Sequence, residues 1–282
     1  MHYFNFRPID QVEETTGIML CDDMYGKTCI LKRRRFDCDV QKEVDIMRTI
    51  HHKNIIQLLD VHQFDAYADI YLAYGGASMF TFLAKFRDKM TPCNYFFFMR
   101  EIANGVHYLH TNRIAHRDIK LENIVIDGNQ IKLIDFGLSH RYDVGDADCT
   151  LYQRCGSRSY CCPEIVYRQV YSGYAADIWS CGIVFYTMLF NNFPFVYYCW
   201  TFPVVKGATV AQQMGKSLVK FVQEFYGKKI HYSDETIALL DKMLQVEPQK
   251  RCSIHDVVQT LYNETSISQM DALKMCAPIV VE

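Results

Sequence analysis

The spacing of hydrophobic positions changes about a quarter of the way along the chain. Before residue 74, short apolar runs at residues 17–21, 28–31, 55–61 and 70–73 are separated by turns rich in Asp, Gly and His. Short apolar runs bounded by turn residues predict β-strands. Between them, Val44, Met47 and Ile50 recur at helical spacing, which predicts a helix over residues 40–50. Asp37 or Asp39 would be its N-cap.

From about residue 78 onward the pattern becomes helical. An apolar stripe at i, i+3, i+4 spacing predicts a long helix, and we interpret it as core rather than as a cofactor site: Tyr95, Met99, Ile102, Val106 and Leu109. Further helices are predicted over residues 175–189, 211–225 and 234–244. The predicted fold class is α+β with two lobes. A small β-rich lobe with one helix covers residues 1–75, a mainly helical lobe covers 76–265, and a short extension follows over 266–282.

Composition limits the function classes. Half of the 282 residues are hydrophobic and 14% are aromatic, which argues against disorder. The formal net charge is −2, so we expect neither a nucleic-acid nor a membrane partner. We also expect a monomer. No apolar run reaches the roughly 18 to 20 residues that cross a bilayer, and the first residues lack a signal pattern. We therefore expect a cytoplasmic or nuclear location.

Twelve cysteines are scattered along the chain, several of them inside apolar runs. Zinc sites need clustered ligands at defined spacing, and that spacing is absent here. We interpret the cysteines as free thiols of a reducing compartment.

The chemistry is concentrated in two motifs. Residues 116–123 read HRDIKLEN, and residues 135–137 read DFG. Asp118 could accept or orient the proton of a substrate hydroxyl, and Lys120 could reach a transferring phosphate. Asn123 and Asp135 offer the oxygen ligands that magnesium prefers. Positioning and charge neutralisation are what phosphoryl transfer needs most.

These motifs resemble the catalytic loop and the metal-binding triplet of eukaryotic protein kinases. Either motif alone would be weak, since a lone Asp or DFG triplet is usually a surface turn. Here they occur in order, and residues 124–134 between them read as a β-hairpin with an Asp-Gly-Asn turn. The resemblance implies a bilobal protein-kinase fold, with ATP and Mg²⁺ as cofactors.

The resemblance extends from about residue 9 to residue 262. Residues 162–164, Cys-Pro-Glu, resemble the Ala-Pro-Glu triplet that closes the activation segment of the family. Asp177 resembles the helix residue that braces the catalytic loop, and Arg251 is the implied ion-pair partner of Glu164. We expect these residues to have structural roles.

In the small lobe, Lys32 resembles the lysine that binds the α- and β-phosphates, and Glu43 resembles its helix partner. As alternatives, Lys32 would be an ordinary solvated lysine and Glu43 an ordinary surface acid. The same resemblance assigns Ile18, Ile30 and Val125 to the adenine pocket. It also implies an apolar column between the lobes, formed by Met47, Leu58, His116 and Phe136.

Lys120 indicates the substrate class, because tyrosine kinases of this family usually lack a lysine there. Gly156-Ser157 also resembles the corresponding step of serine/threonine kinases, and the closest branch is the calmodulin-dependent and energy-sensing one. The implied partners are protein substrates with Ser or Thr acceptors. Glu122 would favour basic residues near the acceptor; as the alternative, it simply faces solvent.

The sequence departs from the family in four places. The glycine-rich loop is missing, since residues 9–17 contain a single glycine, Gly17. Glu13 and Glu14 in this stretch would repel phosphate. Ile30 replaces a small alanine. Lys32 and Glu43 are closer in sequence than in most of the family, which would hold the helix in place. Gln153 stands where the related branch carries a phosphorylated threonine, and Thr150 and Tyr152 are nearby alternatives.

Three functions therefore compete. The first is an active serine/threonine kinase, and the second is a pseudokinase that binds partners without productive nucleotide binding. The third, a small-molecule kinase, is disfavoured by the activation segment. The short chain and the missing glycines also resemble kinases of large DNA viruses, in which case the location would be in a host cell.

Overall fold

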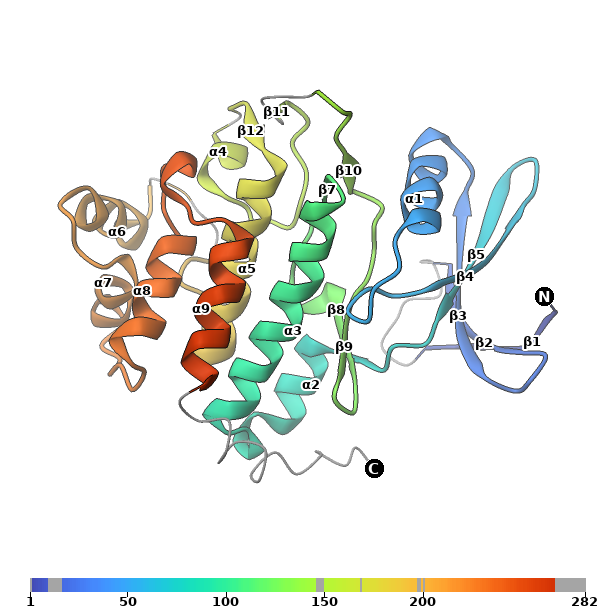
Figure 1. Cartoon of the computed structure of the whole chain (residues 1–282), viewed down its shortest axis with the longest axis horizontal. Coiled ribbons are helices and arrows are strands. Elements are labelled where there is room, and N and C mark those ends of the chain that lie inside the picture. Colours follow the sequence, from blue (N-terminus) through green and yellow to red (C-terminus); the bar gives the residue numbers. More distant parts are fainter. Residues whose placement is uncertain are drawn as a thin grey trace.

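A five-stranded antiparallel sheet forms the N-terminal lobe of the protein (Figure 1). The computed structural model describes residues 2–9, 17–145, 150–167, 169–196, 199 and 201–266. The strands of the sheet are β1 (Tyr3–Pro8), β2 (Ile18–Asp23), β3 (Thr28–Arg35), β4 (Leu58–Gln63) and β5 (Tyr67–Ala73), in the order β1-β2-β3-β5-β4. Helix α1 (Cys38–Thr49) lies between β3 and β4 in the chain and carries Glu43.

The C-terminal lobe is mainly helical (Figure 1). Its helices are α2 (Met79–Phe86), α3 (Pro92–Thr111), α4 (Pro163–Val166), α5 (Gly173–Phe190), α6 (Pro203–Gln213), α7 (Leu218–Phe225), α8 (Asp234–Met243) and α9 (Ile254–Ser266). Short strands connect them: β6 (Ala77–Ser78), β7 (Ile114–Ala115), β8 (Ile124–Asp127), β9 (Gln130–Leu133), β10 (His140–Arg141), β11 (Thr150–Leu151) and β12 (Tyr171–Ser172). Single turns of 3₁₀ helix occur at Arg87–Lys89, Leu121–Asn123 and Pro248–Lys250.

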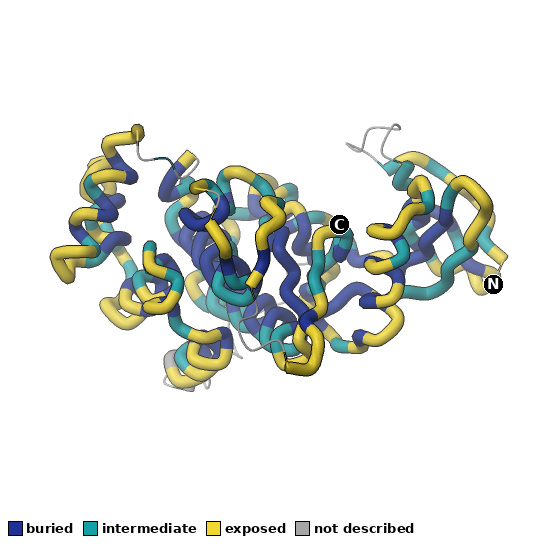
Figure 2. The backbone as a smooth tube through the Cα atoms, turned by 90° about the horizontal axis from the view of Figure 1, so that it is seen from above, coloured by how far each residue is buried: buried dark blue, intermediate teal, exposed yellow. Residues whose placement is uncertain are grey.

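The core of the larger lobe lies around α3 and α5, whose inward faces are apolar. Trp179, Phe185 and Tyr186 on α5 are fully buried, and so are Met99 and Ile102 on α3. Figure 2 shows buried backbone running through the centre of this lobe, with exposed residues along its outer helices. The stripe that predicted α3 is therefore a core stripe, as expected. Within the described part of the chain, no helix is both long and apolar enough to span a membrane.

The predicted strand over residues 55–61 is wrong at its start. Ile55 forms an isolated parallel bridge with Leu133, and the Ile56 N–H donates to the Leu133 carbonyl at 3.0 Å. Both isoleucines are buried, so they attach the segment between α1 and β4 to the β8–β9 hairpin before β4 begins at Leu58. The chain also contains β1, which the sequence pattern did not predict.

The single helix predicted over residues 211–225 is also wrong, because α6 ends at Gln213 and α7 begins at Leu218. Gly215 has φ +73°, a left-handed conformation that ends a helix, and the Ser217 side chain accepts the Lys220 N–H to start the next. The apolar spacing continued across the break because both helices pack on the same core.

Candidate active site

Lys32 and Glu43 form the ion pair that the sequence predicted. Lys32 Nζ lies 2.7 Å from Glu43 Oε1, and their side chains are only 8% and 2% exposed. Neither alternative, a solvated lysine or a surface acid, fits this burial. Helix α1, which carries Glu43, begins at Cys38 because the carboxylate of the preceding Asp37 accepts the N–H groups of Asp39 and Val40. Asp37, rather than Asp39, is thus the N-cap.

Asp135 joins this pair from the other lobe. Lys32 Nζ lies 2.9 Å from Asp135 Oδ1, so one ammonium group connects two carboxylates. Burial alone would lower the pKa of Lys32, but Glu43 and Asp135 outweigh it and raise the pKa. Burial would raise the pKa of Asp135, and the charge of Lys32 outweighs it and lowers the pKa. Lys32 and Asp135 therefore both stay charged across the neutral pH range.

The Asp118 carboxylate is surrounded by donors from two segments. Its Oδ2 accepts from Lys120 Nζ at 2.7 Å and from Asn123 Nδ2 at 2.9 Å. Its Oδ1 accepts from the Ser157 N–H at 3.1 Å and from Ser157 Oγ at 3.0 Å. Lys120 Nζ also donates to Ser157 Oγ at 3.0 Å. The catalytic-loop candidates and the activation segment thus meet in one cluster.

Asp177 fixes the backbone of the loop that carries Asp118. It is fully buried on α5, and its two oxygens accept the N–H groups of His116 and Arg117, each at 2.8 Å. The His110 ring on α3 lies 3.0 Å from the same carboxylate. Arg117 and Asp135 have φ values of 67° and 65°, which are uncommon for residues other than glycine. The surrounding hydrogen bonds fix both residues in this conformation.

A second buried ion pair supports the activation segment. Arg251 Nη1 and Nη2 donate to the two oxygens of Glu164 at 2.6 and 2.8 Å, and both side chains are at most 2% exposed. Arg251 also donates to the backbone carbonyls of Gln245 and Ala175. The resemblance implied this pair, and the structure contains it.

Asn123 and Asp135 are suited to hold a magnesium ion. Asn123 Nδ2 donates to the carbonyl and to Oδ2 of Asp118, which turns the amide oxygen away from Asp118. Asp135 is 43% exposed at its side chain, although one oxygen contacts Lys32. The described residues contain no cluster of three or more His, Cys, Asp or Glu that could hold a metal alone. A magnesium ion here would also need phosphate oxygens, which is its usual mode with nucleotides.

The residues assigned to the adenine pocket come from both lobes, two from the N-terminal sheet and one from β8. In the β2–β3 ladder, Ile18 pairs with Lys32 and Leu20 pairs with Ile30. Because alternate residues of a strand share a face, Ile18 and Ile30 lie on the same face of the sheet as Lys32. Val125 belongs to β8 of the larger lobe. Their contact with adenine remains a prediction.

The connection between the lobes depends on two glycines that no prediction from the sequence included. A Cβ at Gly75 would lie 2.4 Å from a methyl of Val125, and one at Gly76 would lie 2.1 Å from the Ile126 carbonyl oxygen. Gly76 also has φ +84°. The signal was available, since a Gly-Gly pair directly after an apolar strand marks a turn or a close backbone approach.

The predicted apolar column is present where His116 meets Phe136. The His116 and Phe136 rings lie 5.1 Å apart, and both residues are buried. Met47 is buried in the same core, and Leu58 is partly buried against it. Phe136 therefore lies inside the protein, which directs Asp135 toward Lys32.

The region of the missing glycine-rich loop falls mostly outside the described residues, which exclude 10–16 with Glu13 and Glu14. Gly17 itself is described and serves the sheet. Its carbonyl accepts the Arg33 N–H at 2.7 Å, and a Cβ there would lie 2.6 Å from the Arg33 carbonyl oxygen. This glycine is needed for the close approach of β2 to β3.

Two tyrosines near the catalytic loop were not singled out from the sequence. The Tyr160 hydroxyl lies 3.2 Å from Glu122 Oε2 and accepts the Leu121 N–H. The Tyr171 hydroxyl contacts Arg117 and the Gln153 carbonyl. Neither residue belongs to a motif with a mechanism, so sequence spacing alone gave no signal for them.

Comparisons with known proteins agree with this geometry. The model of the protein kinase domain matches residues 23–263. The chain is 32% identical over 246 residues to the carbon catabolite-derepressing protein kinase of Saccharomyces cerevisiae, covering 87% of this chain and 36% of that protein. The namesake in Candida glabrata is 30% identical over 256 residues, covering 90% of this chain and 39% of that one.

A probable serine/threonine-protein kinase of Dictyostelium discoideum, MARK-A, is 30% identical over 224 residues, which cover 78% of this chain and 19% of that protein. The chain thus spans less than two fifths of the length of these curated relatives.

Proposed function

This chain belongs to the protein kinase family, and we propose that it is an active enzyme that transfers the γ-phosphate of ATP to Ser or Thr hydroxyls of protein substrates. The observation that carries the proposal is the cluster around Asp118. Lys120, Asn123 and Ser157 all contact its carboxylate, while Lys32 contacts both Glu43 and Asp135. A scaffold without catalysis has no chemical need for this combination.

The residues have separate tasks in this proposal. Asp118, held by Lys120 and Asn123, would orient an acceptor hydroxyl and take up its proton. Lys120, 2.7 Å from that carboxylate, would place its positive charge beside the transferred phosphate. Lys32, with its charge maintained by Glu43, would bind the phosphates of ATP that remain on the nucleotide.

Asn123 and Asp135 would hold magnesium, which supplies positive charge to the phosphate oxygens when bound. The Asn123 amide nitrogen is already committed to Asp118, so its oxygen is the ligand atom. Asp135 is negatively charged at neutral pH because Lys32 lowers its pKa. Charged and amide oxygens of this kind match the preference of magnesium for hard ligands.

The acceptor class rests on Lys120 and Ser157. The Ser157 hydroxyl contacts both Asp118 and Lys120, so the activation segment lies directly against the reactive carboxylate. Glu122 is exposed next to this point and has the Tyr160 hydroxyl at 3.2 Å, which leaves its charge available to a substrate. A preference for basic residues near the acceptor is part of the proposal. Arg-to-Ala changes in a peptide substrate should matter less for Glu122→Gln than for the wild type.

A pseudokinase is the second candidate, and Gly17 favours it. This glycine stands in the stretch that would cover the phosphates, yet it is used in the contact with Arg33. Ile30 would also narrow the adenine site. Both features would weaken nucleotide binding, but neither removes Lys32, Asp118 or Asp135.

One experiment separates the two functions. Transfer of labelled phosphate from Mg-ATP to a generic protein substrate is compared for the wild type, Asp118→Asn and Asp127→Asn. Asp127 is an exposed aspartate at the end of β8, so it is a control for the same chemical change. We expect transfer by the wild type and Asp127→Asn, and a loss of at least about 100-fold for Asp118→Asn.

Equal and negligible transfer by all three proteins would reject the enzyme proposal. A thermal shift with Mg-ATP then tests the second candidate directly. A pseudokinase that has lost nucleotide binding gives no shift, whereas Asp118→Asn of an active kinase keeps the shift because Lys32, Asn123 and Asp135 remain.

A further inference from the structure

Arg117, which directly precedes Asp118, is nearly buried and requires partners for its charge. It is 8% exposed, and buried arginines are almost always paired or hydrogen-bonded. The activation-segment residue that its guanidinium contacts is Gln153, which cannot be phosphorylated. A phosphate at that position therefore cannot supply the counter-charge.

Among the described residues, the Arg117 side chain contacts neutral groups. Arg117 Nη2 donates to the backbone carbonyl of Gln153 at 3.1 Å, and Arg117 Nε donates to the Tyr171 hydroxyl at 3.1 Å. The Tyr171 hydroxyl in turn donates to the same Gln153 carbonyl at 2.8 Å. Guanidinium, hydroxyl and carbonyl therefore form a closed triangle, and each of its three sides is a hydrogen bond.

Tyr171 is fixed in place independently of this triangle. It lies on β12, pairs with Leu151 of β11 and is 3% exposed. The guanidinium of Arg117 also lies over its ring, 5.9 Å from the centroid. Tyr171 thus contacts the activation segment at three residues: it pairs with Leu151, and its hydroxyl contacts the Gln153 carbonyl and, at 3.5 Å, Cys155 Sγ.

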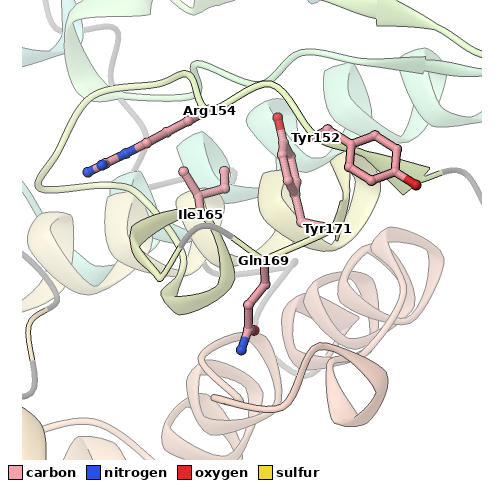
Figure 3. A pocket seen from close by; sticks show the side chains of 5 residues that line it. All are labelled: Tyr152, Arg154, Ile165, Gln169 and Tyr171. Carbon is pink, nitrogen blue, oxygen red and sulfur yellow. The ribbon is translucent and has the colours of Figure 1, made fainter.

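Figure 3 shows Tyr171 with its hydroxyl end toward the loop that carries Tyr152 and Arg154. These side chains, with Ile165 and Gln169, line a cavity of about 280 Å³ beside its ring. Arg154 extends away from Tyr171 in this view. Arg117 is therefore the guanidinium that the hydroxyl engages.

The triangle is connected to the reactive carboxylate on both sides. Arg117 is covalently next to Asp118, and its own N–H is fixed by Asp177. Four residues after Gln153, Ser157 contacts Asp118 through its N–H and its hydroxyl. Between them, Gly156 passes so close that a Cβ would lie 3.0 Å from the Arg117 carbonyl oxygen. A shift of Gln153 would therefore disturb Ser157 and its two hydrogen bonds to Asp118.

We propose that Tyr171 is a positioning residue whose hydroxyl fixes the activation segment on Arg117, so that the segment is ordered without phosphorylation. The proposal deepens the proposed kinase function and rests on it for its kinetic consequences. The hydroxyl supplies one acceptor to Arg117 and one donor to Gln153, the contacts that hold the segment in place.

The test compares Tyr171→Phe with Tyr232→Phe, both in the unphosphorylated full chain with its mass verified. Tyr232 is a matched control, because it is partly buried and its hydroxyl also donates to a backbone carbonyl, that of Leu189, at 2.9 Å. Hydrogen exchange is measured at the backbone amides of residues 150–157. We expect faster exchange there in Tyr171→Phe only, by about 10-fold or more.

In the kinetic experiment, kcat/KM is determined for the protein substrate and KM is determined for ATP. Tyr171→Phe should lower kcat/KM for the protein substrate by about 10-fold while KM for ATP stays within a factor of two. Phosphatase treatment of the wild type should change neither value. Because Arg117→Met removes the same triangle, the double variant with Tyr171→Phe should lose little more than Arg117→Met alone.

The inference is overturned if exchange in Tyr171→Phe equals that of the wild type, if phosphatase abolishes wild-type activity, or if the two substitutions are additive. If the wild type transfers no phosphate at all, the kinase proposal fails. The exchange measurement then still decides whether Tyr171 holds the segment, so the two failures can be told apart.

Discussion

Lys32 Nζ and Glu43 Oε1 are 2.7 Å apart, and the two residues are separated by only 11 positions in the chain. The strand that carries Lys32 ends at Arg35, and the helix that carries Glu43 begins at Cys38. The connection is therefore Phe36 and the N-cap Asp37. So short a tether leaves α1 little freedom to move away from the sheet.

Lengthening this tether should weaken the ion pair. We predict that four Gly/Ser residues inserted between Phe36 and Asp37 lower basal phosphate transfer by about 10-fold, because α1 gains freedom while its N-cap is preserved. The control is the same insertion after Gly227, an open position where an added Cβ would have no atom within 4 Å. Equal activity of both insertion variants would contradict the idea that the short tether holds Glu43.

Removing one partner of the ion pair between Glu164 and Arg251 should destabilise the larger lobe strongly. Both side chains are at most 2% exposed, so Glu164→Gln leaves a buried guanidinium without its counter-charge. We predict a loss of about 3 kcal/mol or more in the free energy of unfolding, measured by urea denaturation. Glu247→Gln, which breaks an exposed pair with Lys250, should cost about 1 kcal/mol or less. Similar losses for both would show that burial does not set the cost.

A side chain at Gly76 should lower the stability of the protein, because it would clash with the backbone of β8. Gly76 and Gly26 have similar φ values of 84° and 76°, but only at Gly76 would a Cβ meet a neighbour, the Ile126 carbonyl oxygen at 2.1 Å. Gly76→Ala should therefore destabilise by about 1 to 3 kcal/mol more than Gly26→Ala. Thermal and urea unfolding of both variants measure this difference, and its absence would mean that backbone conformation alone matters there.

Glu101 should contribute stability that depends on pH. Burial would raise the pKa of Glu101, but hydrogen bonds from Lys53 and Asn54 outweigh it and lower the pKa. A lowered folded-state pKa gives stability that is present above the unfolded-state pKa of about 4.3 and lost as the pH falls through the folded-state value.

The difference in unfolding free energy between wild type and Glu101→Gln should thus be full at pH 6 and shrink below about pH 4. Urea unfolding across this range measures it. Glu224→Gln, at an exposed site on α7, provides the comparison for a glutamate outside such a network. A difference for Glu101→Gln that does not change with pH would mean that its charge contributes nothing.

Some of the structure follows from the local sequence, because a turn needs particular residues and a buried helix face needs hydrophobic residues at helical spacing. The hairpin of β8 and β9 and the core stripe of α3 were predictable in this way. The pairing of Lys32 with Glu43 was expected only from the resemblance to the kinase family. The catalytic-loop motif determined which carboxylate would be central, because Asp118, Lys120 and Asn123 are neighbours in sequence and their spacing is part of the motif.

Other features exist only through contacts between distant segments. Ile55 and Ile56 read as a strand, yet they bind Leu133 because the hairpin offers them a backbone carbonyl and an apolar surface. Tyr171 lies 54 positions from Arg117, and no local pattern marks a tyrosine whose hydroxyl completes a triangle with a guanidinium and a carbonyl. The sequence by itself thus determined the reactive groups, since their chemistry is written in residue type and spacing. Tertiary structure decided what holds them, because burial and hydrogen-bond partners depend on which segments meet.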